Sequence, residues 1–363
     1  MTARSTKILA IAAAVLLVAA VLMNLDGGED TAGGGPLLPD FRDNINSVTS
    51  VAIEQAGERA TILNDGERWV VRERDDYPAD TGKLREALLA LADATRLEAK
   101  TADPARHGQL GLAGAGSEDS TLVDINGDPA TASLILGNTA QREYRYARLA
   151  SEEQAWLIDE NPEFPADPAD WLVTELMDIP SQSVRAVVIQ HADGDELRLA
   201  QADADDGTFV VENVPEGREL TFDGVANGIA AALQGLSLDD VMRAPAEPSE
   251  PDVTTQFTTR DGLIIVATRH RRDDESWYAL AASVDPEHTD AAGSATGDNG
   301  EDSTEAEADG DEASSADERA AAIAERVTGW WFRLPSRKAG LLARSWSDIL
   351  QPPPNADSSD DSS

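Results

Sequence analysis

The strongest constraint on the fold is a short pattern of apolar residues that occurs twice along the chain. Its alternating part is typical of a half-buried strand, and its return at long range indicates an internal duplication. We therefore predict two tandem repeats that each open with a strand. The residues of the pattern are Val48, Val51 and Ile53 in the first copy, and Val184, Val187 and Ile189, with the same spacing, in the second.

Both copies continue with a hairpin and then a helix. A turn at Asn64-Asp65-Gly66 leads to Trp69 in the first copy, and a turn at residues 205–207 leads to Phe209 in the second. We expect these two aromatic residues in the core, against Leu88 and Leu233 of the helices that come next. The helices are predicted from Leu84, Leu88 and Leu91 behind a cap at Asp80, and from Ile229, Leu233 and Leu236 behind a cap at Asp223.

Strand patterns follow each helix, so each repeat reads β-β-β-α-β-β-β. This order predicts an α+β fold with mainly antiparallel sheets and one helix packed on each. A parallel, doubly wound sheet would need more crossover helices than the pattern contains. The later strands are expected at residues 121–125, 133–136, 144–149 and 155–158, and at 253–259, 263–268 and 277–281.

The amino terminus carries an uncharged apolar run at residues 8–23, behind Arg4 and Lys7. Because basic residues stay on the cytoplasmic side of a membrane helix, the rest of the chain is predicted to lie outside, in the periplasm or its equivalent. As a helix the run would be about 24 Å long, against a hydrocarbon layer of about 30 Å. That length also fits a cleaved signal peptide, but residues 22–26 lack the small-x-small cleavage pattern. The sequence favours a single-pass inner-membrane anchor.

The carboxy-terminal segment is predicted to form two short amphipathic helices separated by Pro335. Their apolar stripes are Ile323, Val327, Trp330 and Trp331, then Leu342, Trp346, Ile349 and Leu350. Five basic residues and no acidic one lie in this region: Arg326, Arg333, Arg337, Lys338 and Arg344. Two interpretations remain open. The segment is a clasp that docks on the acidic repeats with its Trp residues in the core, or a surface that touches anionic lipid or a membrane partner.

Composition sets the remaining boundaries, because stretches rich in Gly, Asp and Ser with few apolar residues do not fold alone. The predicted parts are an anchor at residues 1–23, a flexible tether at 24–40, repeats at 41–180 and 181–284, a disordered acidic insert at 285–318, helices at 319–350 and a disordered tail at 351–363.

The charge of the chain argues against nucleic acid as a partner. Asp and Glu number 68 against 29 Lys and Arg, for a net charge of -39, whereas nucleic-acid binding needs a basic surface. Cysteine is absent, which excludes disulfides and an amino-terminal lipid-modified cysteine.

No catalytic motif is present. The chain lacks a Gly-x-Ser-x-Gly elbow, a phosphate-binding loop and a His-Glu-x-x-His helix. His107, His191, His270 and His288 are scattered and expected to be ordinary surface residues. We therefore assign no catalytic, cofactor-binding or metal residue, and predict no cofactor and no enzyme.

Three acidic clusters are the nearest approach to a polar site. Asp203-Ala-Asp205-Asp206-Gly207 has the alternating carboxylates of a calcium loop but lacks its closing Glu, and a hairpin turn explains it. Glu152-Glu153 and Asp239-Asp240 are expected on a solvated face rather than as acid and base pairs.

Four segments together resemble the DUF4340 domain proteins of bacterial envelopes. The resemblance implies an anchored protein outside the inner membrane, a companion of an ABC-type export system similar to the gliding-motility transporters, with no known catalytic residues. The acidic insert departs from the family pattern. The segments are residues 101–112 (TADPARHGQLGL), 165–172 (PADPADWL) with 176–180 (LMDIP), 209–220 (FVVENVPEGREL) and 329–335 (GWWFRLP).

Three functions are consistent with these features. The first is a membrane-anchored extracytoplasmic accessory or scaffold protein of an ABC-type transport complex, with the inner-membrane subunits as partners. The second is a ligand-binding protein that uses a cleft between the two repeats. The third is an enzyme on envelope glycans, which would need two carboxyl groups about 5 to 10 Å apart.

Overall fold

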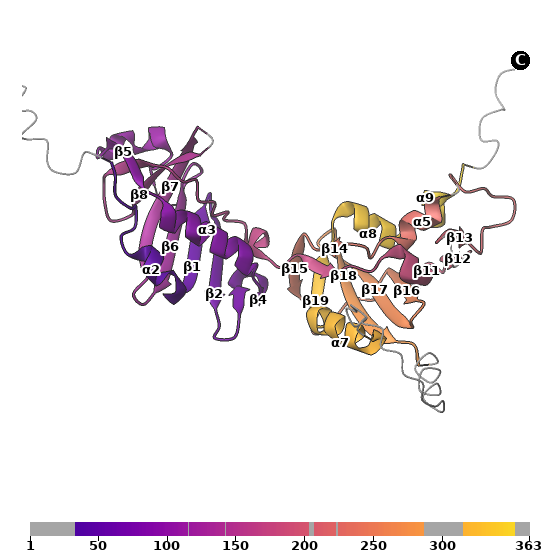
Figure 1. Ribbon diagram of the computed structural model, residues 1–363. Coiled ribbons are helices and arrows are strands. Elements are labelled where there is room, and N and C mark those ends of the chain that lie inside the picture. The colour runs from indigo at the N-terminus through magenta and orange to yellow at the C-terminus, as the bar shows by residue number, and fades with distance from the viewer. Residues whose placement is uncertain are drawn as a thin grey trace, which may run out of the picture. The chain divides into compact units, whose positions relative to one another are not determined.

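The computed structural model describes residues 33–114, 116–141, 143–202, 207–222, 224–286 and 315–352. The chain divides into two units, one ending at Leu172 and one beginning at Val173 (Figure 1). Each unit is built on an antiparallel sheet with helices on it, so the predicted α+β class is confirmed.

The described part of the first unit contains a nine-stranded sheet in the order β4-β3-β2-β1-β6-β7-β8-β9-β5. Every pairing is antiparallel. The strands are β1 (Val48–Gln55), β2 (Glu58–Asn64), β3 (Trp69–Val71), β4 (Tyr77–Pro78), β5 (Arg96–Thr101), β6 (Thr121–Gly127), β7 (Ala132–Ala140), β8 (Tyr144–Leu149) and β9 (Ala155–Ile158).

Helix α3 (Thr81–Asp93) covers this sheet and begins where the sequence predicts. The Asp80 carboxylate accepts hydrogen bonds from the N–H groups of Gly82 and Lys83, at 2.9 and 3.1 Å, and so caps the first turn. Leu84, Leu88 and Leu91 are buried on the face toward the sheet. Two shorter helices, α2 (Phe41–Asn44) and α4 (Pro104–His107), complete the unit.

The described part of the second unit contains an eight-stranded sheet in the order β13-β12-β11-β16-β17-β18-β19-β15. Two further short strands, β10 (Glu175–Met177) and β14 (Leu236–Ser237), pair with each other in a separate sheet. The strands of the large sheet are β11 (Val184–His191), β12 (Glu196–Gln201), β13 (Phe209–Val211), β15 (Asp240–Arg243), β16 (Val253–Thr259), β17 (Leu263–Arg272), β18 (Glu275–Val284) and β19 (Trp330–Arg333).

The two sheets repeat one topology. When the two strand orders are read from β3 and from β13, each strand of the first sheet has a counterpart in the second. The two counterparts have the same rank along their unit of the chain and the same position in the sheet. Even an irregularity is repeated: the pairing register shifts after Val48 in the first unit and after Val184 in the second. Two such bulges at the same place support a duplication of the whole unit.

The two aromatic residues occupy the same ladder position but differ in burial. Trp69 pairs with Asn64, and Phe209 pairs with Gln201, each at the start of a third strand. Phe209 is 1% exposed, and its N–H donates to Asn227 Oδ1 of the helix above it. Trp69 is only half-buried, so its predicted place in the core is wrong. It lies directly after the exposed turn at residues 64–68.

The helix of the second unit is shorter than predicted. α5 spans Val225–Ala230 behind Gly224, and Asp223, the expected cap, lies outside the described residues. Gly235 adopts a left-handed φ of 54°, which ends the turns after α5. Leu236 then belongs to β14, where it pairs with Met177 of β10, and does not extend the helix. Ile229 and Leu233 are buried as expected.

In the carboxy-terminal segment, a strand follows the first helix at residues that the sequence predicts as part of that helix. Helix α7 (Ala316–Val327) ends before Gly329, whose φ of 83° is left-handed, and Trp330 and Trp331 then form β19 between β18 and β15. The helical interpretation of these two residues is therefore wrong. Aromatic residues favour a strand, and here they fill the place that β9 has in the first unit.

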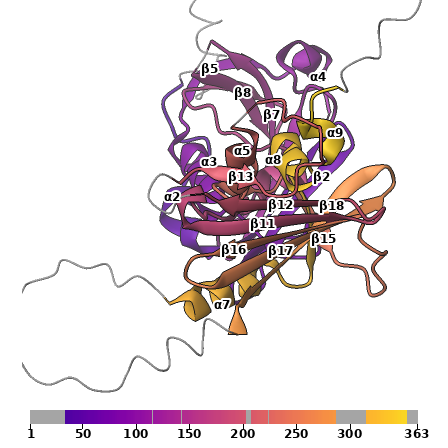
Figure 2. The ribbon, with the colours of Figure 1, turned by 90° about the vertical axis from the view of Figure 1, so that its right-hand side faces the viewer.

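The remaining helices of this unit lie on both faces of its sheet. α7 packs on β17 and β18, while α5 and α8 (Ser336–Leu342) lie on the opposite face, with α9 (Trp346–Ile349) after them in the chain (Figure 2). Ser315 and Glu318 form a capping box at the start of α7. The insert predicted to be disordered at 285–318 therefore extends too far, because residues 315–318 belong to the capped start of α7. Residues 287–314 lie outside the described residues.

The amino-terminal prediction is tested only in part. Residues 1–32 lie outside the described residues, and within the described ranges no helix is long and apolar enough to cross a membrane. The predicted tether at 24–40 is wrong at its end: Leu37 and Leu38 are buried, and the Leu37 N–H donates to the Ala94 carbonyl at 2.7 Å. In the predicted tail, residues 353–363 are likewise not described.

Candidate functional site

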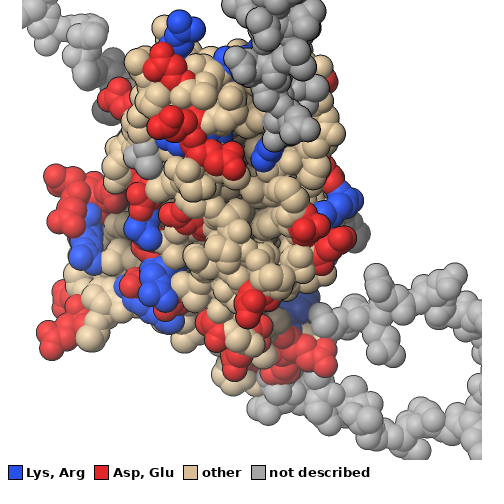
Figure 3. All heavy atoms as spheres, turned by 90° about the vertical axis from the view of Figure 1, so that its left-hand side faces the viewer, with Lys and Arg blue, Asp and Glu red and all other residues tan. Residues whose placement is uncertain are grey.

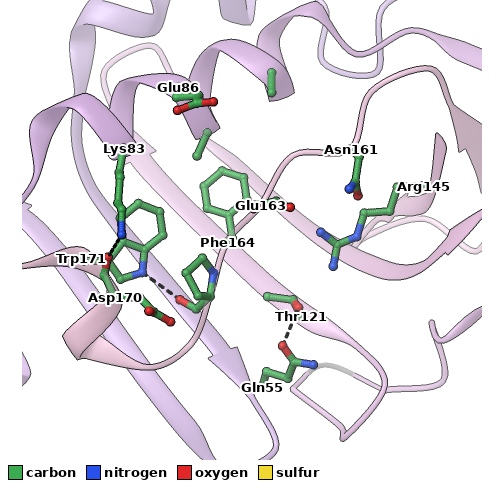
Figure 4. A pocket seen from close by; sticks show the side chains of 13 residues that line it. Gln55, Lys83, Glu86, Thr121, Arg145, Asn161, Glu163, Phe164, Asp170 and Trp171 are labelled. Atoms are coloured by element: carbon green, nitrogen blue, oxygen red, sulfur yellow. Dashed lines mark hydrogen bonds between the residues drawn. The ribbon is translucent and has the colours of Figure 1, made fainter. Parts of the chain in front are cut away.

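The first unit contains a cleft of about 720 Å³ between α3, the sheet and the segment after β9 (Figure 4). Its floor comes from β1, β6 and β8, and its walls from α3 and from residues 161–171. The side chains that line it are those of Gln55, Lys83, Glu86, Ala87, Ala90, Thr121, Arg145, Asn161, Glu163, Phe164, Pro165, Asp170 and Trp171.

Arg145 on β8 is the main cation at the floor of this cleft. Its Nε donates to the Gly137 carbonyl at 2.9 Å, and its Nη1 donates to the Pro162 carbonyl at 2.6 Å. Desolvation by burial lowers the pKa of Arg145 from its ordinary value, although the negative charge of Glu163 opposes that shift. A guanidinium has five N–H donors, and these two bonds use only two of them, so N–H groups of Arg145 remain for a ligand in the cleft.

Polar side chains around Arg145 differ in how they are satisfied. Thr121 donates to Gln55 Oε1 at 3.0 Å, and Gln55 Nε2 donates to the Glu118 carbonyl at 3.0 Å. Asn161 Oδ1, in contrast, is buried and has no hydrogen-bond partner among the described residues. A buried acceptor without a partner costs free energy, which a ligand N–H would recover.

The opposite wall of the cleft is apolar and fixed in place. Phe164 and Trp171 are buried, with ring centroids 6.3 Å apart, and Trp171 Nε1 donates to the Pro165 carbonyl at 2.8 Å. Asp167 caps the turn that carries Trp171 by accepting from the Ala169 N–H at 2.9 Å. At the rim, Lys83 Nζ donates to the Asp170 carbonyl at 2.9 Å.

This arrangement offers complementary groups to a bound ligand. A cleft with one half-buried cation, one unsatisfied acceptor and an aromatic wall can recognise a small molecule or segment that has both polar and apolar parts. In the described residues, no group of three or more His, Asp or Glu side chains is placed to hold a metal ion. Sequence reasoning missed the cleft because its polar residues come from five separate segments and form no motif.

The histidines have structural roles where they are described. His107 is buried, with Nε2 at 2.8 Å from the Glu153 carbonyl, and His270 is 5% exposed and stacks on Trp331 with 4.5 Å between ring centroids. The predicted surface position of both is therefore wrong. His191 donates through Nε2 to the Arg344 carbonyl at 2.9 Å. His288 lies outside the described residues.

The acidic clusters do not form a paired site. Glu152 and Glu153 are exposed, as expected. Asp239 is exposed, but Asp240 is buried and forms an ion pair with Arg333 at 3.5 Å, so the solvated position predicted for Asp240 is wrong. Residues 203–206 of the calcium-like sequence lie outside the described residues.

Two basic residues of the carboxy-terminal segment bind main-chain carbonyls of the second unit, although only Lys338 of the five is buried. Arg326 donates to the Leu176 carbonyl at 2.7 Å, and buried Lys338 donates to the Ala232 carbonyl at 3.0 Å. These contacts favour the clasp interpretation over a lipid-facing surface. On the side of the first unit, which Figure 3 shows, basic side chains (blue) lie among acidic ones (red) rather than in one continuous basic area.

A comparison with protein families identifies one match. The family model described as "Domain of unknown function (DUF4340)" matches residues 69–255, which is just over half of the chain. The matched range runs from β3 of the first unit to β16 of the second, so it includes most of the residues that line the cleft. No curated protein and no solved structure matches the chain.

Proposed function

The chain belongs to the DUF4340 family, and from this premise we propose that it is a membrane-anchored accessory or scaffold protein of an ABC-type transport complex, acting outside the inner membrane. The observation that carries the proposal is the order of parts: an apolar run behind a basic head, then two units of one repeated topology. Such a chain presents two folded units close to a membrane. The transport partner rests on the resemblance of four segments of the chain to envelope proteins of this family.

Affinity purification of the full chain from detergent-solubilised membranes tests this function. With a tag placed after Ser363, we expect an ATPase and a permease subunit to co-purify with the wild-type chain. An unrelated single-pass protein with the same tag is the control. Recovery of no transporter subunit, at wild-type levels of the bait, would contradict the proposal.

A second candidate function, ligand binding, is favoured by the cleft of the first unit. The sequence placed such a site between the repeats, whereas this cleft lies wholly within one unit. Its volume of about 720 Å³ falls in the range of small-molecule and peptide sites. A binding site on the first unit is compatible with an accessory role in transport.

A further inference from the structure

In the second unit, a segment of the chain itself occupies the place that corresponds to the cleft of the first unit. Because the two sheets share one topology, β1 corresponds to β11, and α3 to α5. Gln55, which lines the cleft, is four residues beyond Val51, and His191 is four residues beyond the equivalent Val187. In the second unit, α8 and the residues after it lie over these positions, next to α5.

Side chains of the second sheet hold that segment by its main chain. Tyr278 on β18 donates its hydroxyl hydrogen to the Ala339 carbonyl at 2.9 Å. His191 bonds to the Arg344 carbonyl at 2.9 Å, and Thr255 on β16 donates to the Leu342 carbonyl. The occupant of this place is thus a short peptide segment recognised through its carbonyl groups.

The corresponding segment of the first unit leaves space. Residues 161–171 follow β9, just as α8 and α9 follow the corresponding strand β19. Residues 161–171, however, form one wall of a cleft instead of filling it. Donors of Arg145 and the unpartnered Asn161 Oδ1 are therefore available at a place where the second unit binds main-chain groups. Both lie beside the apolar wall that contains Phe164 (Figure 4).

We propose that this cleft binds a short peptide segment of a partner protein. An oxygen of its main chain, from a carbonyl or the terminal carboxylate, accepts hydrogen bonds from Arg145, and a main-chain N–H donates to Asn161 Oδ1. An apolar side chain of the peptide packs on Phe164. The rim carries Glu86, Glu163 and Asp170 against Lys83, which favours a peptide with basic residues. The inference depends on ligand binding by the first unit and not on the transport partner.

Fluorescence polarisation with a labelled peptide tests the proposal on the full chain in detergent. The probe is fluorescein-Lys-Ala-Phe-Ala-Lys, used with a free carboxylate and with an amide at its end. We expect saturable binding of at least one form. Arg145→Gln should weaken it about tenfold, which corresponds to about 1.4 kcal/mol for a lost charged hydrogen bond. Arg185→Gln, at an exposed arginine of the second unit, should leave it unchanged.

A second variant protects the test against misfolding, since Arg145 also bonds to Gly137 and Pro162. Ala90→Phe on α3 fills the cleft without touching Arg145 and should also abolish binding, while Arg85→Phe on the exposed side of α3 should not. No saturable binding of either peptide form, or binding that survives both Arg145→Gln and Ala90→Phe, would overturn the inference. Co-purification of transporter subunits is a separate readout, so the two proposals fail independently.

Discussion

Lys338 is a buried cation that is bound by main-chain carbonyls. It is 7% exposed, and its Nζ donates to the carbonyls of Ala231, Ala232 and Gln234 just after α5. Burial lowers the pKa of Lys338 from its ordinary value. The carbonyls at the end of a helix carry partial negative charge, so the ammonium ties α8 to α5.

We predict that Lys338→Met destabilises the protein by about 1.5 to 3 kcal/mol, the usual contribution of hydrogen bonds to a charged group. The methionine keeps most of the side-chain volume but leaves three carbonyls without their donor. Urea denaturation measures the change. Arg337→Met, at an exposed neighbour, is the control and should stay within about 0.5 kcal/mol of wild type. Equal stability of the two variants would contradict the assigned role.

Asp252 gives the second unit a defined pH dependence. Burial alone would raise the pKa of its carboxyl group, but Arg269 at 2.7 Å and Arg271 at 2.8 Å outweigh burial and lower it below its ordinary value. A carboxylate with a lowered pKa in the folded state stabilises the protein above the pKa of the unfolded chain, near 3.8. That contribution is lost as the pH falls through the folded-state value.

We therefore expect Asp252→Asn to lower the melting temperature at pH 7 but to have little effect at the lowest pH at which the protein still folds. Thermal melts of both forms between pH 7 and about pH 3 measure the difference, which should shrink as Asp252 is protonated in the wild type. Asp273→Asn, at a carboxylate that is 91% exposed, is the control. A difference that does not change with pH would exclude this ion pair as its source.

At the scale of elements, β19 and α7 show that the second unit continues across the acidic insert. Asp261 lies in the β16–β17 turn, its carboxylate pairs with Arg319 of α7 at 2.7 Å, and the adjacent Gly262 carbonyl accepts from the Asp285 N–H at 2.8 Å. The two ends of the insert are thus held at one hairpin. The sheet depends on residues beyond the insert, because β19 separates β18 from β15.

Replacing residues 287–314 with an eight-residue Gly-Ser linker should leave the second unit folded, with a melting temperature within a few degrees of wild type. A chain that stops after residue 286 should lose the cooperative unfolding of that unit, because β15 and β18 then lack their shared neighbour. Calorimetry of the two variants distinguishes these outcomes. Folding of the shortened chain, or failure of the linker variant, would contradict the assignment of β19.

The strands that the sequence predicted are those with alternating burial, such as β1 and β11. β5 was missed because its side chains are half-buried or exposed without alternation. β19 was mistaken for a helix because Trp330 and Trp331 continue the helical spacing of Ile323 and Val327. Periodicity could not show that Gly329 ends the helix between Val327 and Trp330.

The candidate site escaped prediction for a different reason. Gln55 lies on β1, Arg145 on β8 and Asn161 after β9, and only the pairing of β1, β6, β7, β8 and β9 brings them together. Each residue alone is ordinary in a polar chain. The turns at Asp103 and Asp167 share the sequence Ala-Asp-Pro-Ala, and their capping role is evident only from the hydrogen bonds that the two carboxylates accept from Ala105 and Ala169.

At the scale of the whole molecule, duplication has produced two units of one topology that differ on one face of the sheet. In the second unit, α8 and α9 lie on the face of the sheet that carries α5. In the first unit, the corresponding face carries α3 and has a cleft. A closed copy suits assembly, and an open copy suits binding. The proposed accessory function requires that both units lie on the outer side of the inner membrane.

Location is directly measurable because the chain contains no cysteine. Ser151→Cys places a single thiol in an exposed turn of the first unit, and Ser5→Cys places one before the apolar run. In cells with a permeabilised outer layer but an intact inner membrane, a membrane-impermeant maleimide should label Ser151→Cys and should label Ser5→Cys only after lysis. Labelling of Ser151→Cys only after lysis would contradict an extracytoplasmic function.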